Sequence, residues 1–149
     1  MSSPASFKGH PIHSVLVAFP IGLLIFSLVC DLLGLVYPSN SSWGTVAFYS
    51  MVGGIIGALL AAVPGLVDLL AIRDPQVKKI GVSHMVINLV IVAIFVVDAW
   101  LRYSGNESRF PIILSILGVA LLLVSGWLGG EMVYVHGVAV EPQGDRRER

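Results

Sequence analysis

Residues 110–135 read FPIILSILGVALLLVSGWLGGEMVYV, a run in which Glu131 is the only charged side chain. One helix needs about 20 predominantly apolar residues to cross the hydrocarbon core of a bilayer, so this stretch predicts a membrane-spanning helix. Three more runs have the same character, and they cover residues 14–36, 45–72 and 80–101. The chain is therefore predicted to cross the membrane four times.

The composition agrees with this prediction and excludes several other classes of protein. Hydrophobic residues make up 56% of the 149-residue chain and charged residues 12%, whereas a soluble domain carries about 25% charged residues. A conventional soluble enzyme and a disordered chain are both excluded. A net charge of zero argues against a nucleic-acid partner. The single Cys30 excludes an intrachain disulfide framework.

Short connections at residues 37–44, 73–79 and 102–109 require neighbouring helices to run antiparallel. The predicted fold class is all-α, an integral membrane antiparallel four-helix bundle. It forms one domain over residues 1–140, followed by a polar tail at residues 141–149.

Antiparallel crossing predicts that both termini and the 73–79 loop share one side of the membrane. That side carries most of the Lys and Arg residues, and the other side carries only Arg102 and Arg109. Because Lys and Arg are enriched on the cytoplasmic side, we expect an inner-membrane protein with both termini in the cytoplasm. The Lys and Arg residues on the side of the termini are Lys8, Arg73, Lys78, Lys79, Arg146, Arg147 and Arg149.

The four histidines all fall toward the side of the termini. At about 1.5 Å per residue along a helix, two carboxylates also reach the depth of His84. Asn88 follows His84 by one helical turn on the same face, where it could orient a ligand or bond to the edge of a cofactor. The sequence therefore predicts one polar centre at this end of the bundle, made by His10, His13, Asp68, His84, Glu131 and His136.

Structural roles compete with this interpretation. Asp68 could pair with a nearby Lys or Arg, Glu131 could pair with a histidine, and His10 could be solvated at the interface. His84 is the strongest functional candidate, because ionisable groups inside a membrane are rare and costly. At the opposite end, Asp98 and Arg102 are spaced as a structural ion pair, and Asp31 is expected to have a hydrogen-bonded structural role.

Two stripes of small residues predict close helix contacts. Such stripes let membrane helices approach backbone to backbone, and they could also mediate a homodimer. One stripe comprises Gly53, Gly57, Ala61 and Gly65, and the other comprises Gly126 and Gly130.

Several motifs together resemble one known family. They are GHPIH at residues 9–13, FPIG at 19–22, PGLVD at 64–68, His84 with Asn88, and GWLGGEMVYVHGV at 126–138. This series resembles the DUF2231 family of small four-helix bacterial membrane proteins, which have no assigned function. The resemblance implies the four-helix fold. Such domains also occur beside redox modules of Rieske or cytochrome type, which favours a redox role.

Three functions remain open at this point. The first is a b-type haem held by two of the histidines, with Asn88 nearby, for electron transfer to a redox partner protein. The second is a non-haem membrane enzyme that holds zinc, iron or copper. The third is a non-catalytic membrane subunit or a proton-coupled carrier with a pH-responsive histidine network. Haem is the leading hypothesis. The candidate non-haem ligands are His13, Asp68, His84, Glu131 and His136.

Overall fold

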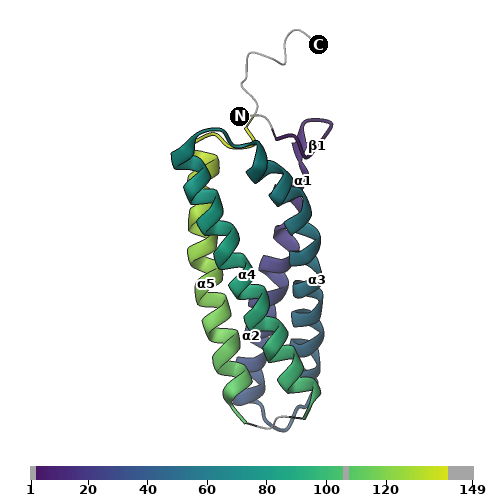
Figure 1. Ribbon diagram of the computed structural model, residues 1–149. Coiled ribbons are helices and arrows are strands. Elements are labelled where there is room, and N and C mark those ends of the chain that lie inside the picture. Colours follow the sequence, from purple (N-terminus) through teal and green to yellow (C-terminus); the bar gives the residue numbers. More distant parts are fainter. Residues whose placement is uncertain (1–2, 106–107, 141–149) are drawn as a thin grey trace.

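The computed structural model describes residues 3–105 and 108–140 and contains four long antiparallel helices (Figure 1). The predicted all-α antiparallel four-helix bundle is confirmed. The proposed polar tail at residues 141–149 lies outside the described residues. In chain order the helices are α1 (Ile12–Leu16), α2 (Ala18–Val36), α3 (Ser42–Ala71), α4 (Pro75–Tyr103) and α5 (Phe110–Tyr134).

The outer surface of the bundle is that of a membrane protein. All four spans are long and apolar enough to cross a bilayer, with α1 and α2 together forming the first. Large apolar side chains cover the outward faces of the helices. Trp100 and Tyr103 are exposed near one end of the bundle, and Trp127 and Tyr134 are exposed toward the other. Aromatic residues in these positions are typical of the two membrane–water interfaces.

Local sequence signals explain where the helices begin and break. The carboxylate of Asp74 caps α4 by accepting hydrogen bonds from the backbone N–H groups of Gln76 and Val77 at 2.8 and 3.1 Å. Between α1 and α2 the helix is interrupted at Val17. Pro20 has no N–H to donate to the carbonyl of Leu16, which accounts for this break.

A short β-hairpin precedes α1 and was not anticipated from the sequence. Strands β1 (Ser6–Phe7) and β2 (His10–Pro11) pair antiparallel, with Phe7 opposite His10. The two turn residues, Lys8 and Gly9, both have positive φ values of 49° and 77°. This backbone is that of a two-residue type I′ turn, which favours glycine.

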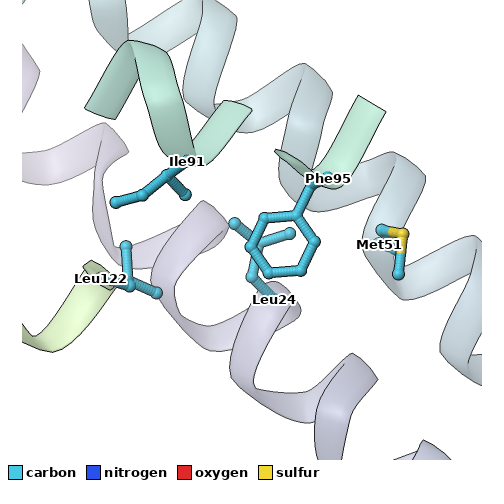
Figure 2. Packing of buried hydrophobic residues seen from close by; sticks show 5 residues of the cluster. All are labelled: Leu24, Met51, Ile91, Phe95 and Leu122. Carbon is cyan, nitrogen blue, oxygen red and sulfur yellow. The ribbon is translucent and has the colours of Figure 1, made fainter. Parts of the chain in front are cut away.

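The main apolar core lies between the four helices near the middle of the bundle (Figure 2). Every long helix contributes at least one fully or nearly buried side chain to it. Gly118 on α5 leaves room for Phe95 on α4, since a Cβ at this glycine would lie 2.6 Å from the aromatic ring. The core residues are Leu24, Met51, Ile91, Phe95 and Leu122.

The two predicted stripes of small residues differ in how closely they pack against other helices. On α3, a Cβ at Gly57 would lie 3.2 Å from the ring of Pro20, and one at Gly53 would lie 3.3 Å from Leu23. The first stripe therefore packs closely against α2, as predicted. On α5, a Cβ at Gly126 would meet nothing within 4 Å, and one at Gly130 would meet only Tyr134 of the same helix. The prediction that this second stripe packs against another helix of the chain is wrong, and the homodimer stays a prediction.

We expect the substitution Gly57→Leu to destabilise the protein by about 1–3 kcal/mol, because overpacking forces side chains and backbone apart. Thermal unfolding of the detergent-solubilised protein measures this change. Gly126→Leu is the matched control, since its side chain enters open space, and it should change stability by less than about 0.5 kcal/mol. Equal effects of the two substitutions would contradict the packing described above.

Candidate cofactor-binding site

His13 is held by the helix that it faces. Its Nδ1 lies 2.8 Å from the backbone carbonyl oxygen of Ala61 on α3. Because a carbonyl oxygen only accepts hydrogen bonds, Nδ1 is the donor, and the neutral ring keeps an unprotonated Nε2. A Cβ at Gly65 would lie 2.7 Å from this Nδ1. The backbone of α3 can therefore approach the imidazole closely only because residue 65 has no side chain.

His84 is held in the same way by a different helix. Its Nδ1 lies 2.9 Å from the carbonyl oxygen of Ser125 on α5 and 3.0 Å from the hydroxyl of that residue. Asn88 donates from its Nδ2 to the same hydroxyl at 2.6 Å and to the carbonyl of His84 at 2.8 Å. A Cβ at Gly129 would lie 3.3 Å from Cε1 of His84. Asn88 and Ser125 thus fix the position and tautomer of the ring.

The two imidazoles meet across the bundle. Their ring centroids lie 6.5 Å apart and their planes are almost perpendicular, at 88°. Within residues 3–105 and 108–140, neither Nε2 takes part in a hydrogen bond. His13 and His84, called the histidine pair below, therefore offer two unprotonated ring nitrogens from opposing helices. The sequence analysis placed both residues in one centre, and the structure brings them together.

A family model described as a predicted membrane protein matches residues 9–142 of the chain. The chain belongs to the DUF2231 family. The match includes the histidine pair and every other residue proposed above for the site. No curated protein and no solved structure matches the chain.

The other two histidines of this DUF2231 chain lie nearer the ends of their elements. His10 is exposed in the hairpin, where its Nδ1 lies 3.0 Å from the carbonyl oxygen of Lys8. His136 follows α5 and is half-buried, and its backbone N–H donates to the carbonyl of Glu131 at 3.3 Å. Glu131 itself is half-buried in the last turn of α5.

Asp68 anchors the N-terminal segment to α3. Its Oδ1 accepts hydrogen bonds from the hydroxyl of Ser3 at 2.7 Å and from the backbone N–H of Ala5 at 3.2 Å. In the described part of the chain it forms no ion pair with a neighbouring Lys or Arg. This carboxylate therefore holds the hairpin that leads into α1 and His13.

The predicted larger centre does not form around one metal ion. Among the described residues, no three His, Cys, Asp or Glu side chains are placed to hold a metal ion together. Of the non-haem set of His13, Asp68, His84, Glu131 and His136, the structure brings His13 and His84 into contact, and the ligand set stays a prediction. Sequence reasoning missed Ser125, whose one signal was a hydroxyl within an apolar helix. The role of the Ala61 carbonyl cannot be recognised in a sequence, because every residue carries a backbone carbonyl group.

Proposed function

We propose that this protein is a membrane electron-transfer subunit that holds one b-type haem between His13 and His84. The observation that carries the proposal is the geometry of the histidine pair, with each Nδ1 bonded to a backbone carbonyl and each Nε2 without a hydrogen bond to any described residue. Histidines that bind a metal almost always donate their other ring N–H to such a partner, which fixes the tautomer. A helix bundle commonly builds cofactor sites from side chains on facing helices.

The separation of the two rings fits a shared ion. With metal–nitrogen bonds of about 2 Å, and about 1 Å from each nitrogen to its ring centroid, two imidazoles on opposite sides of one ion have centroids about 6 Å apart. The observed centroid distance is 6.5 Å. The distance between the rings therefore supports a site with two histidine ligands.

The number of ligands favours haem over a non-haem ion. A structural or catalytic zinc takes three or four protein ligands, and the described residues offer only the histidine pair in one place. A porphyrin supplies four nitrogens itself, so its iron needs at most two protein ligands. Gly65 and Gly129 let the backbones of α3 and α5 pack directly against the two imidazole rings, which holds the two candidate ligands in place.

Bound haem would supply reversible one-electron transfer, and the protein would set its potential through the two ligands and their burial. The roles of the chain's own residues follow from their contacts. Ala61 and Ser125 hold the imidazoles in the ligating tautomer, and Asn88 orients Ser125. Both rings are half-buried among apolar helices.

The distribution of charge supports a cytoplasmic location for the histidine pair. The end of the bundle that contains the pair carries Lys8, Arg73, Lys78 and Lys79 among the described residues. At the opposite end, Arg102 is bound by two carboxylates within the bundle. We propose an inner-membrane protein with its N-terminus and the 73–79 loop in the cytoplasm, following the enrichment of Lys and Arg on that side.

The test is an absorption spectrum of the purified full-length protein, reduced minus oxidised, together with elemental analysis. The expected result is a Soret band, an α band in the reduced protein and about one iron per chain, since the residues form one two-histidine site. A bound metal without a Soret band would favour the non-haem alternative. The lack of both metal and Soret band, after expression in cells that make haem, would overturn the proposal.

A further inference from the structure

An ion cluster lies at the end of the bundle opposite the histidine pair. Arg102 donates from Nη1 and Nη2 to the two carboxylate oxygens of Asp31 at 2.6 and 2.8 Å, and from Nε to Asp98 at 2.7 Å. Ser115 completes the cluster with a hydroxyl 2.7 Å from Oδ2 of Asp98. These four residues, called the ion cluster below, join α2, α4 and α5.

The charges in the ion cluster do not balance. Asp98 is fully buried and Asp31 is 6% exposed, yet the two carboxylates share one guanidinium group. Among the described residues, the other groups that border the adjoining cavity add no cation: α2 contributes the thiol of Cys30 beside Asp31, Ser41 precedes α3, and Gly44 lies in the first turn of α3. With both carboxylates ionised, one negative charge would be uncompensated inside a membrane, where such charges are rare and costly.

Ser115 contacts all three charged side chains of the ion cluster. Its oxygen lies 2.7 Å from Oδ2 of Asp98 and 3.3 Å from Oδ2 of Asp31. A hydroxyl has one hydrogen, whereas an ionised carboxylate is only an acceptor. Nη2 of Arg102 donates to this hydroxyl at 3.2 Å, so the one hydroxyl hydrogen serves both carboxyl groups. A proton held by either carboxyl group would give each contact a hydrogen of its own.

A cavity connects the ion cluster with the loop end of the bundle. It has a volume of about 300 Å³ and is open to the outside. Asp31 and Arg102 border it on one side, and Asn40 and Ser41 border it near the α2–α3 connection. A cavity of this size with several polar partners can hold water, which would give protons a route to Asp31.

We propose that the ion cluster is a proton-binding site that holds one proton on the Asp31–Asp98 carboxyl pair and exchanges it with the aqueous phase through this cavity. A hydronium ion in the cavity gives its proton to a carboxylate oxygen and becomes water. The net charge of the ion cluster then changes from −1 to zero, and release reverses the step. The inference is independent of the proposed haem, because the histidine pair lies at the other end of the bundle.

The test is an infrared spectrum of the full-length protein at neutral pH, recorded in H₂O and in D₂O. A protonated carboxyl group has a C=O stretching band that moves to lower frequency in D₂O, and carboxylates lack this band. We expect such a band from one carboxyl group per chain. We also expect it to disappear in one step as the pH is raised.

Variants assign the band to the ion cluster. Asp31→Asn and Asp98→Asn should each abolish it, because one carboxylate and one guanidinium then balance. Asp68→Asn, which removes a carboxylate at the other end of the bundle, should leave the band unchanged. A wild-type spectrum without the band at neutral pH would overturn the proposal, as would a band that survives in both cluster variants. The wild-type pH titration decides the question even where a variant fails to fold.

Discussion

His84→Ala is expected to abolish haem binding, leaving less than about a tenth of the wild-type Soret absorbance per chain. The substitution removes one of the two ligands and leaves the backbone of α4 in place. It also leaves Asn88 and Ser125 bonded to one another, so the fold should survive. The Soret absorbance and iron content of the purified variant, each divided by protein concentration, measure the loss.

The other histidines provide matched controls for this prediction. His13→Ala should cause the same loss as His84→Ala, whereas His10→Ala and His136→Ala should retain haem at the wild-type level. Asn88→Ala should weaken binding by roughly 10–100-fold, as is usual when a group that orients a metal ligand is removed. Full haem retention in both His13→Ala and His84→Ala would show that the pair does not hold the iron.

Most of the fold could be predicted from the sequence because a bilayer imposes simple rules. The predicted run at residues 110–135 differs from α5 (Phe110–Tyr134) by one residue at its end. The break at Val17 and the N-terminal hairpin were missed. Both depend on local backbone conformation, and neither changes the hydropathy of the chain.

The histidine pair was only partly predictable. His13 and His84 were grouped with four other residues by their predicted depth in the membrane and by the side of the membrane to which they lie closer. The position of a residue along a helix gives its depth but not the direction in which its side chain points. Glu131 shares that depth and His10 was predicted at the rim of the centre. Among the described residues, the structure places neither of them with the pair around one metal ion. The hydrogen-bond partners of the two rings are backbone carbonyls, which cannot be recognised in a sequence.

The ion cluster could be predicted only in part from the spacing of residues along the sequence. The pair of Asp98 and Arg102 was predicted because residues four apart lie on one helix face, and the structure confirms it at 2.7 Å. The pairing of Arg102 with Asp31 was missed, because these residues are 71 positions apart in the sequence. A useful signal did exist: a carboxylate inside an apolar run requires a partner, and few cations lie at that depth.

Arg102→Gln should destabilise the protein more than any other single substitution in the ion cluster. It leaves the buried Asp31–Asp98 carboxyl pair, which holds one proton and one negative charge, without its cation, and breaking a buried ion pair in this way costs about 3–5 kcal/mol. For a chain of this size the corresponding fall in melting temperature is roughly 10 °C. Thermal unfolding in detergent at neutral pH measures it. Arg109→Gln is the control, because Arg109 is exposed, and it should have almost no effect.

The size of this effect should depend on pH in a defined direction. As the pH falls, the remaining carboxylate of the Asp31–Asp98 pair takes up a proton and no longer needs the guanidinium group, so the difference in stability between wild type and Arg102→Gln should shrink. Adding Asp31→Asn and Asp98→Asn to Arg102→Gln removes both carboxyl groups and with them the uncompensated negative charge. The triple variant should recover most of the lost stability at neutral pH, since neutral groups of similar shape are often tolerated where an ion pair was buried. A penalty that is independent of pH and remains in the triple variant would mean that Arg102 stabilises the bundle by packing rather than by balancing these two carboxyl groups.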